Sequence, residues 1–108
     1  MQSIAKQVFE SQVLAISKAK SRIGPAFDQA VETILASKGR IIISGMGKSG
    51  IIGKKIASTF SSTGTPSFTV HPGEAYHGDL GMITRDDTMI LISHSGETEE
   101  VIRLIPSI

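Results

Sequence analysis

The sequence predicts an α/β protein with a doubly wound parallel sheet, reduced to about three strands and preceded by two helices. Apolar residues recur at helical spacing before residue 38, and short apolar runs follow at residues 41–44, 67–70 and 87–93. A further helical pattern separates the first two of these runs. Strands that alternate with helices in this way form parallel sheets whose faces are covered by the helices.

Two amphipathic helices are expected at about residues 3–22 and 25–37. Gly24 and Pro25 interrupt the apolar pattern, and a new helix can begin there because proline is accepted in the first turn of a helix. Gly39 ends the second helix. Steps of three, four and seven place one set of apolar side chains on one face: Phe9, Val13, Ile16, Ile23, Phe27, Val31, Ile34 and Leu35. Such a face is typical of a core or of a subunit interface, and it indicates no chemistry.

From residue 39 the pattern changes to that of an α/β unit. The continuous run at residues 41–44 is typical of a strand buried on both faces of a parallel sheet. A glycine-rich turn follows, and a helix is expected from about residue 51 to 62. After the strand at 67–70, residues 71–81 hold four glycines or prolines and predict irregular chain. The strand at 87–93 leads through a polar turn into a last helix at about 97–105.

The 108 residues amount to one domain at most. We interpret the helical part (1–38) and the α/β part (39–108) as the N-terminal part of a single domain in a longer polypeptide. Three parallel strands make about half of the usual doubly wound sheet. A third strand with an unpaired apolar edge would also be prone to aggregate.

The composition excludes several classes of protein. Hydrophobic residues make up 40% and charged residues 19%, which is enough apolar material for a core and excludes a disordered chain. The net charge of +1, without a basic block, leaves no electrostatic footprint for nucleic acid. The longest apolar runs are far shorter than a membrane span, and no secretory signal is visible, so a cytoplasmic location is expected. The absence of cysteine excludes disulfides, thiol catalysis and cysteine-bound zinc.

The first candidate site is the turn at residues 45–50, Gly-Met-Gly-Lys-Ser-Gly. It matches the G-x-G-x-x-G pattern between a strand and a helix, but a dinucleotide site also needs an acidic residue at the end of the second strand, where none is present. A nucleotide-binding P-loop would need a glycine at position 42, which is Ile42. No cofactor is therefore predicted. The interpretation that remains is a site for an anion, held by backbone N–H groups near Lys48 and Ser49. The alternative is a glycine turn that only lets helix and strand pack closely.

The second candidate site is the loop at residues 93–98, Ser-His-Ser-Gly-Glu-Thr. Three hydroxyls around a glycine at a strand-to-helix turn have the composition of a phosphate cradle built from neutral donors. The alternative is N-capping, in which a hydroxyl satisfies a free N–H group and the glutamates complement the helix dipole. Capping explains one hydroxyl, but it does not explain three hydroxyls together with the similar loop at residues 45–50 after another strand. The phosphate cradle is therefore favoured.

Together with residues 62–68 (Ser-Thr-Gly-Thr-Pro-Ser-Phe) and 71–81 (His-Pro-Gly-Glu-Ala-Tyr-His-Gly-Asp-Leu-Gly), these loops resemble the sugar isomerase (SIS) domain. Within that superfamily they resemble arabinose-5-phosphate isomerases of the KpsF/GutQ type. The resemblance implies a flavodoxin-like fold, a homo-oligomer with active sites between subunits, and a sugar phosphate as ligand. It implies interconversion of D-ribulose 5-phosphate and D-arabinose 5-phosphate through an enediol, as a step toward Kdo for lipopolysaccharide or capsule. The alternatives are a non-catalytic, regulatory sugar-phosphate-binding SIS module and a fragment that folds only inside an assembly.

The resemblance also implies roles for particular residues. It makes Lys48, Glu100 and His77 catalytic, and two further active-site residues of the family, a glutamate and a histidine, have no counterpart in this chain. A proton shift between C1 and C2 needs a base and a donor for the developing oxyanion. Glu100 is the expected base and Lys48 the stabilising cation, while Glu97 is an alternative base, and a solvated acidic first turn is a third possibility. The substrate-binding set is Gly47, Ser49, Ser93, His94, Ser95, Glu97 and Thr98, in which His94 takes the place of the family's usual Asn or Gln.

Zinc is the last possibility that the sequence raises. His71, Glu74, His77 and Asp79 are close in sequence and are all possible ligands. Their spacing matches no standard pair of ligands on a helix. Polar groups of a substrate pocket or of the loop explain them better, and no metal is predicted.

Overall fold

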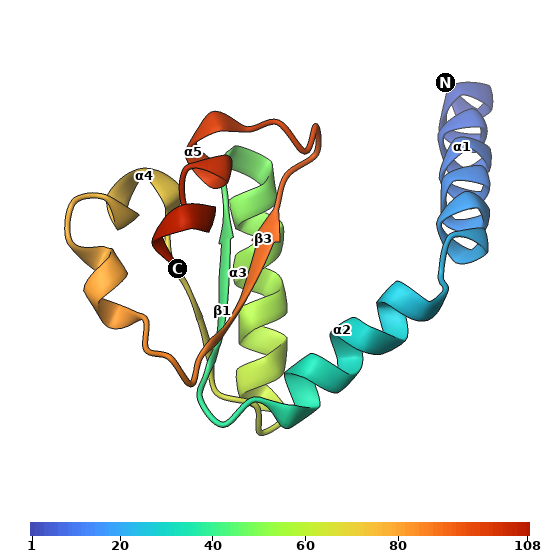
Figure 1. Cartoon of the computed structure of the whole chain (residues 1–108). Helices are drawn as coiled ribbons and strands as arrows, with labels where there is room; N and C mark the ends of the chain where they lie inside the picture. Colours follow the sequence, from blue (N-terminus) through green and yellow to red (C-terminus); the bar gives the residue numbers. More distant parts are fainter. The chain divides into compact units, whose positions relative to one another are not determined.

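A computed structural model describes all 108 residues, and Figure 1 shows the order of its elements. The chain divides into two compact units, residues 1–32 and 33–108. The helices are α1 (Gln2–Ser21), α2 (Pro25–Ala36), α3 (Gly47–Ser62), α4 (Pro72–Ala75) and α5 (Glu99–Ile102), with short 3-10 turns η1 (Asp79–Met82) and η2 (Ile105–Ser107). The strands are β1 (Ile41–Gly45), β2 (Ser67–Thr69) and β3 (Thr88–Ile92).

The three strands form a parallel sheet in the order β2-β1-β3. After β1 the chain passes through α3 to β2, and after β2 it crosses past β1 to reach β3 on the other side. The strand order therefore reverses at β1. The predicted α/β class with a three-stranded parallel sheet is confirmed.

Strand β1 is the centre of the fold, because its side chains alternate between two apolar clusters. Ile42 packs on one face of the sheet with residues that follow β2 and α5: Val70, Ala75 and Leu104. Ile41 and Ile43 pack on the other face against Ala57 of α3. None of the three isoleucines is more than 1% exposed. Full burial of such a side chain stabilises a fold by roughly 1.5–3 kcal/mol.

A polar clamp joins the beginnings of β1 and β3. The buried carboxylate of Asp87 accepts hydrogen bonds from Arg40 N at 2.7 Å, Arg40 Nη2 at 3.1 Å and Thr84 N at 2.8 Å. The Arg40 guanidinium and the two backbone donors hold the pKa of Asp87 well below its usual range. The Arg40 guanidinium also lies 4.7 Å from the ring centre of Phe68 in β2. One arginine thus ties together the amino-terminal ends of all three strands.

Three predicted elements differ from the structure. Helix α3 begins at Gly47 rather than near residue 51, so the glycine-rich turn is itself the first helical turn. Residues 71–81 contain α4 and η1 instead of purely irregular chain, because His71 caps α4 and Pro72 occupies its first turn. The predicted helix at 97–105 is wrong. Only α5 and the separate turn η2 form there, since Pro106 has no N–H to donate to the carbonyl of Ile102, as a continuous α-helix would require.

The helices before β1 were expected at 3–22 and 25–37, and α1 and α2 agree with this to within a residue at each end. Neither helix has a buried residue. Phe9 is 75% exposed and Leu35 80% exposed, so most of the apolar face is not a core in this chain, although Ile34 packs against the cluster around Ile41 and Ile43. No helix has both the length and the hydropathy needed to cross a membrane.

Candidate functional site

The two candidate loops leave neighbouring strands at the same end of the sheet (Figure 1). Gly45, the last residue of β1, stands opposite Ile92, the last residue of β3. The loops at residues 45–50 and 93–98 therefore start side by side. This is also the point where the strand order reverses, the usual ligand position in doubly wound sheets.

In the first loop, the glycines have two separate functions. A Cβ on Gly50 would lie 2.6 Å from the carbonyl oxygen of Gly45, so Gly50 is needed for α3 to pack closely against β1. Gly47 has open space around it but a φ of +56°, which an L side chain rarely adopts. Close packing, the alternative interpretation of this turn, is therefore correct for Gly50, and it leaves the rest of the loop available for a ligand.

Lys48 and Ser49 lie in the first turn of α3. The backbone N–H of Ser49 donates to Met46 O at 3.1 Å, which leaves the N–H groups of Gly47 and Lys48 without a partner within the helix. Lys48 is exposed and Ser49 is half-buried. Neither the Lys48 ammonium nor the Ser49 hydroxyl has a hydrogen-bond or ion-pair partner in the chain. A cation, a hydroxyl and the positive end of a helix dipole thus share one turn, an arrangement that favours an anion.

In the second loop, the hydroxyls bond within the loop itself. Ser93 Oγ accepts from Gly96 N at 3.0 Å and lies 2.7 Å from Thr98 Oγ1, and Ser95 Oγ accepts from Glu97 N at 3.0 Å. None of them caps α5, whose N-cap residue Thr98 makes no side-chain cap hydrogen bond. The N-capping alternative is therefore wrong for these hydroxyls.

The same hydrogen bonds leave protons free for a ligand. A serine hydroxyl that accepts an N–H bond keeps its own proton to donate. Ser95 is in this state, and within the Ser93–Thr98 pair only one of the two protons is used between the oxygens. The loop is thus a preformed turn whose free hydroxyl donors are neutral.

The acidic residues near this loop are exposed to water. Glu97 lies in the loop, and Glu99 and Glu100 begin α5; all three are exposed and none forms an ion pair. The structure does not distinguish Glu100 from Glu97 as the base, and the choice stays a prediction.

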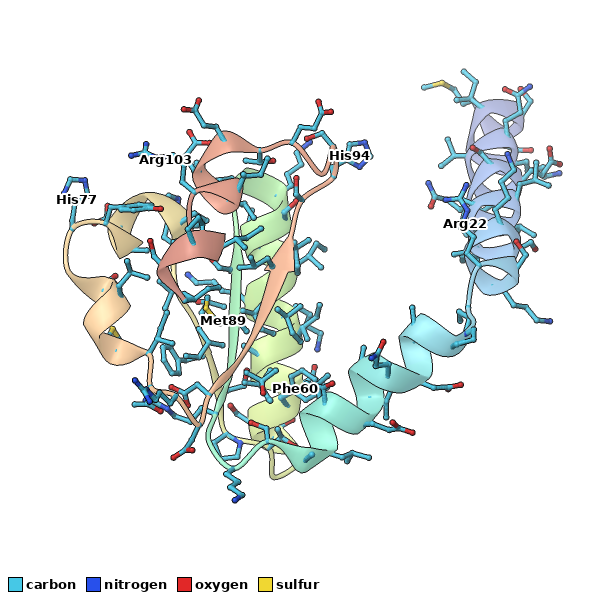
Figure 2. All side chains as sticks on the ribbon, in the orientation of Figure 1. Arg22, Phe60, His77, Met89, His94 and Arg103 are labelled. Atoms are coloured by element: carbon cyan, nitrogen blue, oxygen red, sulfur yellow. The ribbon has the colours of Figure 1, made fainter.

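The two histidines of the predicted site are far apart. His94 lies in the 93–98 loop, and His77 lies in the turn after α4; Figure 2 shows them on opposite sides of this end of the molecule. His77 is therefore not brought to the loop at residues 93–98 within one chain. No three histidine, aspartate or glutamate side chains gather closely enough to hold a metal ion, so the possible ligands at residues 71–79 do not converge.

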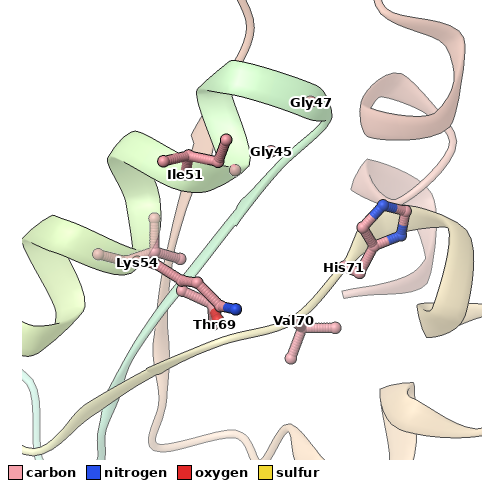
Figure 3. A pocket seen from close by; sticks show the side chains of 9 residues that line it. Gly45, Gly47, Ile51, Lys54, Thr69, Val70 and His71 are labelled. Carbon is pink, nitrogen blue, oxygen red and sulfur yellow. The ribbon is translucent and has the colours of Figure 1, made fainter.

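A pocket of about 290 Å³ lies on the other side of the first loop (Figure 3). Its walls come from the β1–α3 turn, from α3 and from the end of β2. The lining residues are Ile43, Gly45, Gly47, Gly50, Ile51, Lys54, Thr69, Val70 and His71. Sequence reasoning missed Lys54 and Thr69, and it considered His71 only as a possible metal ligand. Lys54 could have been found, since it lies two helical turns after Gly47 and so shares its helix face.

Comparison with known proteins identifies the family. The model of the SIS domain family matches residues 34–108. This chain belongs to the SIS domain family. The resemblance predicted from the two loops is thereby confirmed.

Several relatives of this SIS domain carry the same name. Arabinose 5-phosphate isomerase KdsD of Pseudomonas aeruginosa is 56% identical over 94 residues, covering 87% of this chain and 29% of that protein. Arabinose 5-phosphate isomerase KpsF of Escherichia coli O6:H1 is 48% identical over 104 residues, covering 95% of this chain and 32% of that protein. The chain thus spans about a third of the length of these curated relatives.

A solved structure shares the fold closely. The structure of an E. coli CFT073 protein in complex with A5P superposes with a TM-score of 0.90 at 43% identity. The match covers 96% of this chain and 55% of that one.

Proposed function

We propose that this SIS domain carries the sugar-phosphate-binding part of a cytoplasmic aldose–ketose isomerase. The reaction is the interconversion of D-arabinose 5-phosphate and D-ribulose 5-phosphate, in the supply of Kdo for the cell envelope. The observation that carries the proposal is the meeting of two donor-rich loops at neighbouring strand ends, where the strand order reverses. The names of the relatives and the bound A5P of the E. coli structure support the choice of substrate.

The phosphate lies between the two loops in this proposal. The first loop offers the Ser49 hydroxyl and the backbone N–H groups that begin α3 at Gly47. The second loop offers the hydroxyl protons that its own hydrogen bonds leave free, from Ser95 and from the Ser93–Thr98 pair. His94 contributes through its backbone, and its side chain is not required. Neutral donors suit a ligand that must also leave again, because each bond is weaker than a bidentate arginine contact.

The chemical step moves one proton between C2 and C1. Glu100 removes the proton from C2 of the aldose while O1 gains a proton, which gives the enediol. The O2 hydroxyl then loses its proton and C1 gains one, which gives the ketose, so atoms and charge balance. Lys48 stabilises the negative charge that develops on oxygen during both half-steps. Glu97 is the alternative base.

The proposal includes a homo-oligomer. Phe9, Val13 and Leu35 are examples of large apolar side chains that α1 and α2 leave exposed, and an interface between copies would bury them. A second copy would also explain His77, which no contact within one chain brings to the phosphate loop. Light scattering on the purified full-length gene product tests this part, and a monomer at micromolar concentration would contradict it.

The decisive experiment follows ribulose 5-phosphate in D₂O by proton NMR with the full-length gene product. Arabinose 5-phosphate that carries deuterium at C2 is the expected product, because the base exchanges its proton with solvent. Saturable binding of the sugar phosphate without deuterium uptake would instead favour the non-catalytic, regulatory SIS module. The Glu100→Gln variant is the control for exchange that does not depend on the protein's base.

A further inference from the structure

A single tyrosine side chain ties α4 to α5. The Tyr76 hydroxyl donates a hydrogen bond to the main-chain oxygen of Arg103, and the Arg103 guanidinium lies 4.9 Å from the centre of the Tyr76 ring. Tyr76 is the residue at which α4 ends, and Arg103 is the residue at which α5 ends. Their neighbours in the sequence, Ala75 and Leu104, are both buried in the apolar cluster around Ile42. The two short helices are therefore joined both in the core and at the surface.

The Tyr76 hydroxyl satisfies a carbonyl group that the backbone leaves without a donor. In a helix that continued, Arg103 O would accept from an N–H group three or four residues later. The residue three positions later is Pro106, which has no N–H, and Ser107 N donates to Leu104 O at 2.9 Å instead. No backbone N–H of the chain donates to Arg103 O. The Tyr76 hydroxyl therefore caps the C-terminal end of α5.

Glu100, the proposed base, depends on α5 for its position. It lies one helical turn before Arg103, and its exposed carboxylate has no hydrogen-bond or ion-pair partner in the chain. Helix α5 has only four residues, and its N-cap residue Thr98 makes no side-chain cap hydrogen bond. A helix of this length is not stable without tertiary contacts. The contacts that hold α5 therefore determine where Glu100 lies, and the bond from Tyr76 is the side-chain hydrogen bond at its C-terminal end.

We propose that Tyr76 is a positioning residue of the isomerase reaction, whose hydroxyl fixes the end of α5 and so holds Glu100 within reach of the C2 proton. This inference rests on the proposed function and adds a residue to it. Tyr76 acts through the backbone of α5 and does not touch the substrate. A displacement of a reacting group by about 1 Å can cost on the order of a hundredfold in rate. The turn at residues 93–98 is held by its own hydrogen bonds, so phosphate binding does not depend on Tyr76.

The pair of side chains offers a matched pair of variants. Tyr76→Phe removes the hydroxyl and keeps an aromatic ring beside the Arg103 guanidinium. Arg103→Lys keeps the main-chain oxygen and the positive charge but loses the planar guanidinium that stacks on the ring. Tyr76 is 41% exposed and Arg103 is exposed, so both variants should fold. If the hydrogen bond positions α5, only Tyr76→Phe should slow the reaction.

The experiment measures kcat and KM for the conversion of ribulose 5-phosphate by the full-length gene product and both variants. Tyr76→Phe should lower kcat about tenfold and leave KM within about twofold of the wild-type value, because the base is displaced while the phosphate donors are not. Arg103→Lys should leave both constants within about twofold of the wild-type values.

A second measurement separates positioning of the base from a general effect on the fold. Glu100→Asp shortens the proposed base by one methylene group, so its carboxylate is displaced before Tyr76 is changed. In this background Tyr76→Phe should lower kcat by less than about threefold, since residues that act through one another are not additive. The matched control is Glu97→Asp, in which Tyr76→Phe should keep its full effect of about tenfold.

Three results would overturn the role of Tyr76: an unchanged kcat in Tyr76→Phe, an equal loss in Arg103→Lys, or effects of Tyr76→Phe and Glu100→Asp that simply multiply. A rise in KM at constant kcat would also overturn it, because Tyr76 would then serve binding. Each of these results requires an active wild-type protein and leaves the proposed function standing. A wild-type protein that does not convert ribulose 5-phosphate would instead overturn the proposed function, and this inference with it.

Discussion

Replacing Asp87 with asparagine should destabilise the fold strongly. Asp87 has only 1% of its side chain exposed, and its carboxylate accepts from Arg40 N, Nε and Nη2 and from Thr84 N at 2.7–3.3 Å. Removing one partner of a buried ion pair costs about 3–5 kcal/mol. Arg40 is 41% exposed and can regain water, so we expect the lower end, about 3 kcal/mol of unfolding free energy.

Asp86→Asn is the matched control, because the exposed Asp86 uses its main-chain carbonyl to accept from Gly39 N at 2.8 Å. Its substitution should change the unfolding free energy by less than about 0.5 kcal/mol. Urea unfolding at pH 7, followed by circular dichroism, measures both variants. Equal effects at the two positions would refute the assignment of stability to the Asp87 carboxylate.

The same clamp predicts a pH dependence with a definite sign. The pKa of Asp87 is lowered in the folded protein by the Arg40 guanidinium and by the backbone donors, whereas in the unfolded chain it is about 3.9. A lowered folded pKa stabilises the protein fully above the unfolded pKa, and this stabilisation is lost as the pH falls from there toward the folded pKa. The difference in stability between wild type and Asp87→Asn should therefore be constant from pH 7 to 5 and shrink below about pH 4. A difference that stays constant down to pH 3, or one that already shrinks above pH 5, would refute this origin.

Four further predictions concern the two loops. Lys48→Ala should abolish turnover in the full-length gene product while urea unfolding stays unchanged, and near-normal rates would remove Lys48 from the mechanism. Glu100→Gln should abolish deuterium uptake from D₂O; if Glu97→Gln does so instead, Glu97 is the base. Ser95→Ala should raise KM and leave kcat nearly unchanged, because a phosphate contact made equally in ground and transition states is uniform binding, and a fall in kcat at constant KM would contradict that role. Gly50→Ala should lower the unfolding free energy by about 1–3 kcal/mol, since its Cβ would meet Gly45 O at 2.6 Å; a variant that gains the stability alanine usually gives a helix would contradict the close approach.

The strands and their class could be predicted because their signals are local. The β-branched run at residues 41–43 reads as a buried strand on its own, and each of the three isoleucines is buried as expected. The strand order could not be predicted in the same way, because pairing of β1 with β3 joins residues more than 40 positions apart. The last helix was predicted too long for a local reason, since Pro106, one residue beyond the predicted span, lies in the separate turn η2 and has no N–H to donate to an α-helix.

For the site, the sequence predicted the two loops, but it predicted neither the hydrogen bonds within the second loop nor the pocket beside the first. Loop composition reveals donors, whereas the hydrogen bonds within residues 93–98 that decide which protons remain free depend on the folded turn. The pocket wall formed by Lys54 and His71 combines a helix face with a strand end, and only the parallel pairing of β1 and β2 brings these together. The orientation of His71 depends further on the Gly73 amide, two residues later.

The groups proposed for binding and those proposed for catalysis differ in how well the fold of this chain holds them. The proposed phosphate donors are preformed, because the turn of residues 93–98 is stabilised by its own hydrogen bonds and the first turn of α3 by the close contact of Gly50 with Gly45. The candidate bases differ, since Glu97 and Glu100 are exposed to water and no other side chain of the chain holds either carboxylate in an ion pair. A general base in an isomerase works best when burial raises its pKa toward neutrality. Catalysis therefore requires that the substrate or a second copy of the chain cover these carboxylates, and affinity for the sugar phosphate should outlast turnover when the oligomer is dissociated.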